Sequence, residues 1–202
     1  MTFYHGTMQA GLTELESRSK DHGGGGPVVY ATASAAYALV YIRDLEIDWV
    51  TAGVDAGGVV RYDERFEDQL RVLYQGVSGY VYTLTDSGFE PTAKRGVWVS
   101  RTCTPVASAR FVPDVYTEML ECEARGALAV NRFSALSPDA RQANHDTMVT
   151  DLYLTDPGKI SACKAAFYQT YFAEAWEHVQ AHPEGRAQAL AQVEAARSKR
   201  GT

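Results

Sequence analysis

A histidine near the start of the chain combines a titratable ring with an open stretch of backbone. His5 stands in the segment Tyr4-His5-Gly6-Thr7, at the end of a predicted strand. Because the glycine that follows it has no Cβ, a ligand can approach the backbone closely there. The segment therefore predicts a ligand site at a strand end. The alternative is a histidine that only caps the strand.

Two tyrosines flank the junction between a predicted strand and a predicted helix. Tyr30 lies in the apolar run over residues 27–32, and Tyr37 lies in a helix predicted over residues 34–44 with Ser34 as its N-cap. The small residues between the two tyrosines leave room for a planar ring. This pattern favours an aromatic wall of a binding site, and ordinary core packing is the alternative.

The elements that must position these residues are short strands with few helices between them. Strands are predicted over residues 2–5, 27–32, 48–51, 58–62, 79–85, 96–101 and 105–111, with a second helix over 64–73. Further helices are predicted over residues 139–152, 157–182 and 184–199. This order predicts an α+β fold, with a domain over residues 1–135 and a helical C-terminal appendage over residues 136–202.

The composition is that of an ordinary globular protein. The 202 residues include 19 Lys and Arg against 25 Asp and Glu, a net charge of −6, and 46% are apolar. This balance argues against broad coating of nucleic acid, since Lys and Arg supply that affinity. The chain shows no basic segment followed by an apolar run, and no window approaches the roughly 18 apolar residues of a membrane span. We expect a cytoplasmic protein with no membrane partner.

No metal site is predicted. The three cysteines, Cys103, Cys122 and Cys163, are widely separated and match neither a disulfide framework nor a zinc motif. His145 and His178 lack carboxylate or cysteine partners at ligand spacing. The thiols are consistent with a reducing compartment.

The order of these motifs resembles the ADP-ribosyltransferase fold of the diphtheria-toxin and poly(ADP-ribose) polymerase type. The shared features are the His-Gly-Thr strand, the Ser- and Gly-rich loop, and the strand that ends in Tyr-Ala-Thr before a Ser-Ala-x-Tyr helix. The resemblance extends from residue 1 to about residue 112 and is most specific over residues 3–7 and 27–41. It implies two small, strongly twisted antiparallel sheets with an NAD cleft between them.

The resemblance also implies roles for individual residues. In the family the histidine binds the adenosine ribose, the adjacent glycine backbone holds the nicotinamide carboxamide, and tyrosines stack on the nicotinamide ring. The implied cofactor contacts here are His5, Gly6, Thr7, Tyr30, Ala31 and Tyr37. Ser19, Lys20 and His22, with Arg18 as a further basic residue, are candidates to contact the pyrophosphate, because family members often place such a segment on the adenosine side. Solvated loop residues are the alternative. The glycines 23–26 are a candidate flap over the cofactor, and a plain flexible loop is the alternative.

One signature position departs from the family pattern. The alignment places Val97 where the family commonly has a glutamate that binds the nicotinamide ribose, and a valine cannot stabilise positive charge. Three hypotheses follow. The acceptor brings its own carboxylate or phosphate, the protein is an inactive NAD-binding descendant, or a carboxylate comes from elsewhere, with the candidates Glu90, Glu118, Glu121 and Glu123.

The favoured function is a mono-ADP-ribosyltransferase, with a catalytic set formed by His5, Tyr30, Tyr37 and position 97. NAD is then a substrate, and the acceptor is a protein, a nucleic acid or a small molecule. The sequence has no Gly-x-Gly-x-x-Gly turn after a predicted strand, and a Rossmann dehydrogenase would be expected to have one. RNA 2′-phosphotransferases share the fold, but their two arginines around the histidine are missing here. The alternatives are an NAD- or ADP-ribose-binding module without turnover and, third, a purely structural protein.

Overall fold

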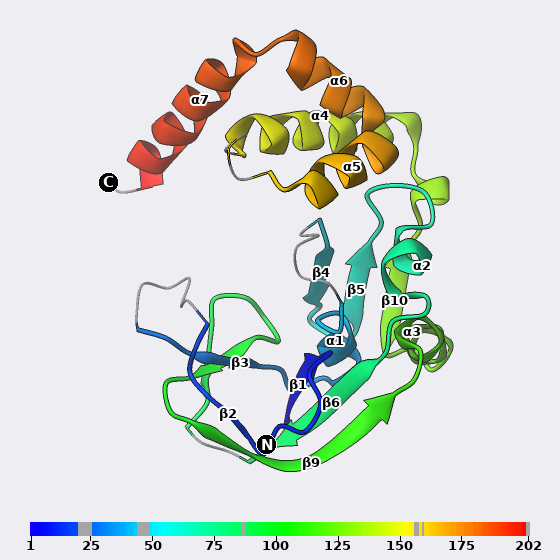
Figure 1. The fold of residues 1–202 in the computed structure, drawn as a ribbon, viewed down its shortest axis with the longest axis vertical. Helices are drawn as coiled ribbons and strands as arrows, with labels where there is room; N and C mark the ends of the chain where they lie inside the picture. Colours follow the sequence, from blue (N-terminus) through cyan, green and yellow to red (C-terminus); the bar gives the residue numbers. More distant parts are fainter. Residues whose placement is uncertain (20–25, 44–48, 86–87, 156–157, 159, 201–202) are drawn as a thin grey trace. The chain divides into compact units, whose positions relative to one another are not determined.

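Strands β1 and β3, which carry His5 and Tyr30, belong to two different sheets of the computed structural model (Figure 1). The first sheet has the strand order β1-β6-β9-β2, with β1 at Phe3–Thr7, β6 at Gly79–Leu84, β9 at Thr104–Val112 and β2 at Glu14–Leu15. The second has the order β3-β8-β7, with β3 at Val29–Ala31, β8 at Trp98–Ser100 and β7 at Glu90–Pro91. Both are antiparallel throughout.

The structure describes residues 1–19, 26–43, 49–85, 88–155, 158 and 160–200, with side chains to residue 195. His22, Lys20 and the glycines 23–25, all predicted to lie near a cofactor, fall outside the described residues. The chain divides into two units, Met1–Phe133 and Ser134–Thr202, which are described separately. The sequence placed the domain boundary after residue 135.

A third sheet departs from the antiparallel pattern expected for the strands. It has the order β10-β5-β4, with β4 at Thr51–Val54, β5 at Val60–Asp63 and β10 at Leu128–Asn131. Strand β10 pairs with β5 in parallel, which requires a long crossover between them. Helix α3, Val115–Ala124, lies in this crossover, where the Asp114 carboxylate accepts the Thr117 N–H at 2.7 Å as its N-cap. Neither α3 nor β10 was predicted from the sequence.

Helix α1, Ala35–Leu39, follows directly on β3. The predicted N-cap is confirmed, because Ser34 Oγ accepts the Tyr37 N–H at 3.2 Å. Helix α2, Gln69–Tyr74, begins five residues later than the start predicted for it. The delay has a physical cause, since the Glu64 carboxylate accepts the backbone N–H of Leu70 and leaves 64–68 as a connecting loop.

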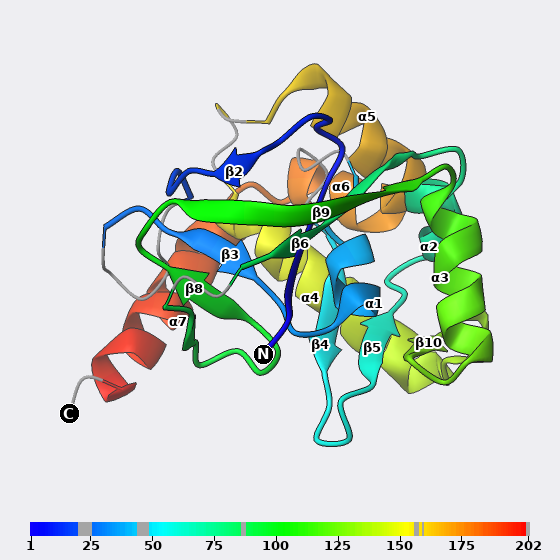
Figure 2. The same ribbon diagram turned by 90° about the horizontal axis from the view of Figure 1, so that it is seen from below.

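An apolar cluster lies between the first two sheets. Phe3 of β1 packs against Phe89 with ring centroids 4.4 Å apart and against Trp98 of β8 at 5.3 Å. The buried members of the cluster are Phe3, Leu15, Val29, Ala31, Tyr82, Leu84 and Phe89. Since they come from both sheets, this cluster holds β1 and β3 close together. Figure 2 shows the strands of the two sheets from below.

The second unit is helical. Its helices are α4 at Pro138–Leu154, α5 at Ala162–Tyr171, α6 at Ala173–Ala181 and α7 at Gly185–Arg200, after a 3-10 turn at Phe133–Ala135. The single helix predicted over 157–182 is wrong, because Phe172 leaves the helical region with φ −135° and ψ 39° and separates α5 from α6. No helix in the described part of the chain is both long and apolar enough to cross a bilayer.

Candidate functional site

A short backbone bridge joins β1 to β3. The Tyr4 N–H donates to the Thr32 carbonyl at 2.7 Å, and the Thr32 N–H donates to the Tyr4 carbonyl at 3.0 Å. His5 follows Tyr4 on β1, and its imidazole reaches the backbone of Tyr30 on β3. The predicted histidine and the first predicted tyrosine are therefore brought together at the point where the two sheets meet.

His5 contacts the backbone of Tyr30 rather than its ring. The imidazole Nδ1–H donates to the Tyr30 carbonyl oxygen at 2.9 Å, which fixes the tautomer. Burial lowers the pKa of His5, and the hydrogen bond to Tyr30 offsets only part of that effect. The ring is therefore neutral near pH 7. Its Nε2 is left as a hydrogen-bond acceptor, which suits a hydroxyl donor better than a phosphate.

Gly6 is packed tightly against helix α1. A Cβ at this position would lie 1.8 Å from the Ala38 carbonyl oxygen and 3.1 Å from Ile42 Cγ1. The sequence predicted that a ligand would approach the Gly6 backbone closely, but on this side helix α1 occupies that space. The N–H and C=O of Tyr4 point toward the β3 segment and not toward β6. The backbone N–H and C=O groups of successive residues in a strand point alternately to its two sides, so those of Gly6 point to the same side as those of Tyr4. The Gly6 N–H and C=O therefore face away from β6 as well.

Tyr37 is buried, and its neighbour Tyr41 is exposed. Tyr37 is 1% exposed and donates its hydroxyl to the Ala52 carbonyl at 3.2 Å. Tyr41 is 38% exposed, and its hydroxyl donates to the Tyr37 hydroxyl at 3.3 Å. The two rings meet edge to face, with their centroids 5.5 Å apart. The ammonium of Lys94 lies 5.7 Å from the centre of the Tyr37 ring. Sequence reasoning missed Tyr41, although its i,i+4 spacing from Tyr37 places both on one face of a helical turn.

The two predicted tyrosine rings do not stack on each other. Among the described residues, the Tyr37 ring contacts Tyr41 and Lys94 and makes no ring contact with Tyr30. Val29 and Ala31 point into the apolar cluster, so Tyr30 lies on the opposite face of β3. The structure therefore does not bring the rings of Tyr30 and Tyr37 into contact with each other.

Desolvation raises the phenol pKa values of Tyr37 and of Tyr41, whose hydroxyl bonds the buried Tyr37 hydroxyl although part of its ring is exposed. For Tyr37 the hydrogen bond from Tyr41 lowers the pKa in part, whereas for Tyr41 the contact with Tyr37 raises it further. Both hydroxyls therefore keep their protons at neutral pH. They act as hydrogen-bond donors and not as bases.

The remaining predicted contacts have local structural roles. The Thr7 hydroxyl accepts the Gln9 N–H at 3.2 Å just after β1. Ser19 forms a backbone bridge to Val28, at 3.1 and 2.8 Å, and so fixes one end of the segment before β3. Ala31 is buried in the apolar cluster beside Trp98. Each lies within or next to the strands that carry His5 and Tyr30.

Val97 lies in a tight turn before β8. Its N–H donates to the Lys94 carbonyl at 3.1 Å, and its carbonyl accepts the Thr92 N–H at 3.0 Å. Gly96 adopts φ +79°, a conformation that glycine tolerates at little cost. The turn presents the apolar, half-buried side chain of Val97 at the position where the resemblance implies a carboxylate.

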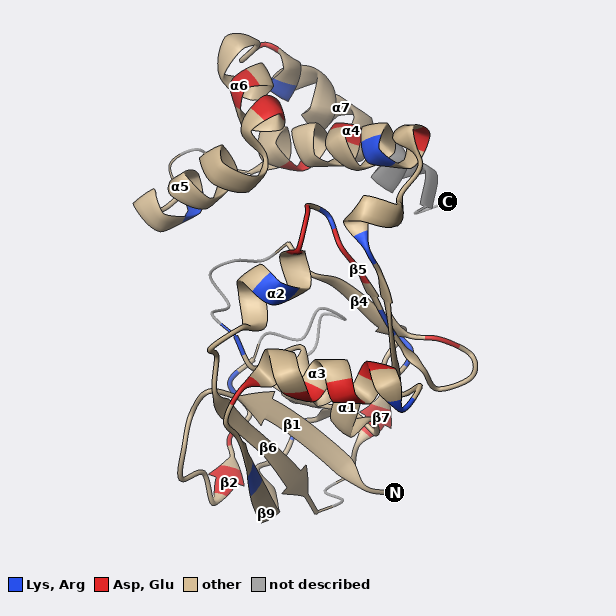
Figure 3. Cartoon of the chain, turned by 90° about the vertical axis from the view of Figure 1, so that its right-hand side faces the viewer, with Lys and Arg blue, Asp and Glu red and all other residues tan. Residues whose placement is uncertain are grey.

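Three of the alternative carboxylates are already engaged. Helix α3 carries a run of acidic residues (Figure 3). Glu118 pairs with Arg110 at 3.0 Å and with Arg125 at 3.7 Å. The other two glutamates pair with arginines as well, Glu121 with Arg125 and Glu123 with Arg132. The fourth candidate, Glu90, is exposed on β7.

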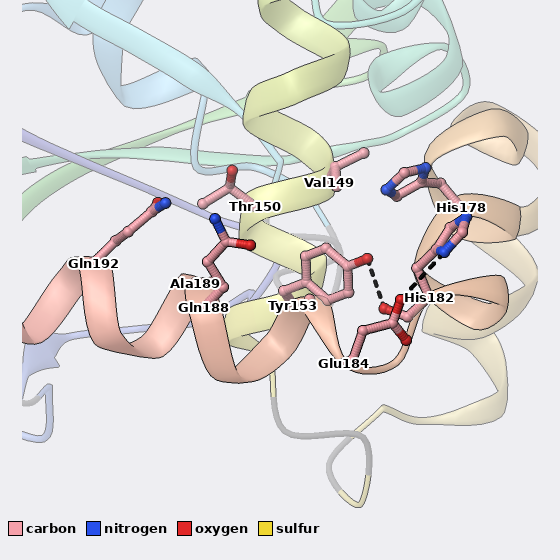
Figure 4. Close-up of a pocket in the computed structure, with 10 residues that line it drawn as sticks. Val149, Thr150, Tyr153, His178, His182, Glu184, Gln188, Ala189 and Gln192 are labelled. Atoms are coloured by element: carbon pink, nitrogen blue, oxygen red, sulfur yellow. Dashed lines mark hydrogen bonds and ion pairs between the residues drawn. The ribbon is translucent and has the colours of Figure 1, made fainter.

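A separate pocket lies within the helical unit, between α4, the end of α6 and the start of α7 (Figure 4). Its volume is about 410 Å³, and its lining includes Tyr153, His178, His182 and Gln188. The Tyr153 hydroxyl donates to the His182 carbonyl at 2.8 Å, and its ring fills the space beside Gly185. The described residues contain no group of three metal-ligating side chains, here or in the first unit.

No protein-family model, no curated protein and no solved structure matches this chain.

Proposed function

We propose that the protein is a mono-ADP-ribosyltransferase that cleaves the nicotinamide–ribose bond of NAD and passes ADP-ribose to an acceptor. The observation that carries the proposal is the pairing of two binding groups on consecutive residues of β1. These are the neutral imidazole of His5, anchored on the Tyr30 carbonyl, and the peptide edge of Gly6, which faces away from β6 on the side of β3. Together they match the two ends of NAD that must be held while the bond between them breaks.

Each group has a chemical counterpart in NAD. The His5 Nε2 is an acceptor for a ribose hydroxyl. The N–H and C=O of Gly6 complement a carboxamide, which carries both a donor and an acceptor. The exposed ring of Tyr41 beside Tyr37 offers an apolar face to the nicotinamide. Binding both ends in a bent form favours departure of nicotinamide through an oxocarbenium-like state.

A specific observation supports a second candidate function, an NAD- or ADP-ribose-binding module without turnover. Val97 carries no charge, and the ammonium of Lys94 lies over the Tyr37 ring. A positive charge at that place opposes the positive charge that develops on the ribose. Binding alone does not require that charge to be stabilised.

Two measurements with NAD separate the two functions. Calorimetry reports binding, and release of the label from NAD labelled in its nicotinamide reports bond cleavage. NAD labelled in its adenosine reports transfer of ADP-ribose to an acceptor in lysate. The transferase predicts binding and nicotinamide release, both lost in His5→Ala. Binding without release identifies the module, and no binding contradicts both proposals. Val97→Glu is expected to raise NAD hydrolysis, and an unchanged rate counts against the alignment of position 97.

A further inference from the structure

We infer that the free edge of strand β9 is an interface at which two copies of this chain pair, so that their sheets join into one antiparallel sheet across a two-fold axis. The free edge is residues 107–111, with the sequence Ala-Ser-Ala-Arg-Phe. Strand β9 follows the border of the first unit (Figure 1). The inference does not depend on the proposed transferase function, because it uses none of the contacts assigned to NAD.

The edge is uncovered because β2 is much shorter than β9. Strand β2 pairs only with residues 104–105, and the Val106 N–H donates to the Thr13 carbonyl at 3.0 Å. Beyond this point, nothing in the described part of the chain pairs with β9 on that side. Every residue of the free edge is exposed, and none is a lysine or a proline, which often protect such edges. An unprotected edge of this kind is a template for another strand.

The hydrogen-bond pattern of the sheet shows which backbone groups of β9 point outward. Tyr4 turns its N–H and C=O toward β3, so its partner Thr83 on β6 turns these groups toward β9 and bonds Ser108. Successive residues alternate, so the N–H and C=O of Ala109 and Phe111 point away from β6. Among the described residues these groups have no partner. They are available to a strand added at this edge.

The free edge is complementary to itself in an antiparallel register centred on Ala109. A two-fold axis there places Ala109 opposite its own copy, and the outward N–H of each donates to the outward carbonyl of the other. The same axis places Phe111 opposite the small Ala107 of the second copy. The ring of Phe111 is 53% exposed and packs on Tyr80 with centroids 5.3 Å apart. Pairing would therefore cover an exposed aromatic ring with a residue that leaves room for it.

Charge does not oppose this register. Arg110 is the one charged residue of the free edge, and the axis places it opposite Ser108 of the second copy. Its guanidinium already pairs with Glu118 on α3 at 3.0 Å. No like charges therefore meet in the paired stretch. A second copy is the occupant that this symmetric match favours, and assembly closes at two because both copies use the same edge.

The test places a charge at the centre of the interface. Ala109→Lys or Ala109→Glu alone sets two like charges opposite each other, so each should raise the dimer dissociation constant about fivefold or more. An equimolar mixture of the two variants sets opposite charges there and should form a heterodimer as tight as the wild-type dimer or tighter. Sedimentation velocity over a concentration series measures the dissociation constants, and melting temperatures show that each variant is folded. Ala187→Lys, exposed on α7, is the control and should dimerise like the wild type.

The remaining outcomes overturn the inference. Wild-type protein that is monomeric at every concentration excludes a second copy as the occupant and leaves the edge to a strand of another protein. Dimers of unchanged affinity in both Ala109 variants place the interface elsewhere. Equal weakening in Ala187→Lys, or no recovery in the mixture, means that the two copies do not meet at Ala109. None of these results bears on the transferase function, which the NAD measurements test.

Discussion

The Nδ1 atom of His5 lies 2.9 Å from the Tyr30 carbonyl oxygen and joins the edge of one sheet to the edge of another. This bond comes one residue beyond the backbone bridge between Tyr4 and Thr32. It therefore has two consequences. It adds to the cohesion of the two sheets, and it fixes which ring nitrogen is available to a ligand.

Replacing His5 with alanine is expected to weaken NAD binding at least about tenfold, because a hydrogen bond worth about 1.4 kcal/mol corresponds to that factor. The fold should lose about 1 kcal/mol of unfolding free energy with the Tyr30 bond. Calorimetry and denaturant unfolding measure the two effects. His145→Ala, in the helical unit, serves as the matched control. Unchanged NAD affinity in His5→Ala would remove this residue from the site.

The lowered pKa of His5 makes stability depend on pH in a defined direction. The unfolded chain takes up a proton near 6.5, whereas the folded protein takes it up only at lower pH. The contribution of neutral His5 to the free energy of unfolding is therefore fully present above pH 6.5. It is lost as the pH falls below 6.5 and through the lowered pKa that His5 has in the folded protein. Denaturant unfolding of wild type and His5→Gln over this range checks the sign. Parallel curves for the two proteins would contradict it.

Gly6→Ala is expected to destabilise the protein by about 3 kcal/mol, because the new Cβ would meet the Ala38 carbonyl oxygen at 1.8 Å. Backbone atoms cannot move aside as a flexible side chain does. Gly53→Ala on β4 is the control, since nothing lies within 4 Å of a Cβ there. Denaturant midpoints of the two variants should differ clearly, and equal midpoints would show that α1 does not pack on β1 as described.

Glu64 stabilises the connections at β5, α2 and the end of the first unit. Its buried carboxylate accepts the Leu70 N–H at 3.1 Å and the Phe133 N–H at 3.0 Å and lies 3.8 Å from Arg132. Glu64→Gln replaces one acceptor oxygen by a donor and removes the charge, so we expect a loss of about 2 kcal/mol. Glu67→Gln should change stability by less than about 0.5 kcal/mol. A similar small change in both would mean that the carboxylate is not an acceptor of these bonds.

Alanine at Tyr37 should mainly lower stability, whereas alanine at Tyr41 should mainly lower NAD affinity. Tyr37→Ala removes a fully buried ring and is expected to cost about 3 kcal/mol or more. Tyr41→Ala removes an exposed ring, so it should cost less than about 1 kcal/mol yet weaken NAD binding severalfold. Unfolding and calorimetry on both proteins separate packing from ligand contact. Full NAD affinity in a folded Tyr41→Ala protein would exclude Tyr41 as a stacking ring.

Local signals in the sequence predicted several elements correctly. The apolar strands β1, β3 and β6 and the Ser34 cap of α1 all lie where the sequence placed them, because each depends on residues within a few positions of one another. The prediction was wrong at α5 and α6, where helical periodicity continues through Phe172 although the backbone does not. It also missed α3, whose cap signal at Asp114 is present in the sequence.

The sequence by itself determined the α+β composition of the fold and selected the strands that bear His5 and Tyr30. Only the tertiary structure decided that His5 binds the Tyr30 backbone, that Ala38 occupies the space beside Gly6, and that β2 leaves residues 107–111 of β9 as a free edge. The reason is physical. Periodicity and capping are set by neighbours along the chain, whereas strand register and close packing join residues that are tens of positions apart.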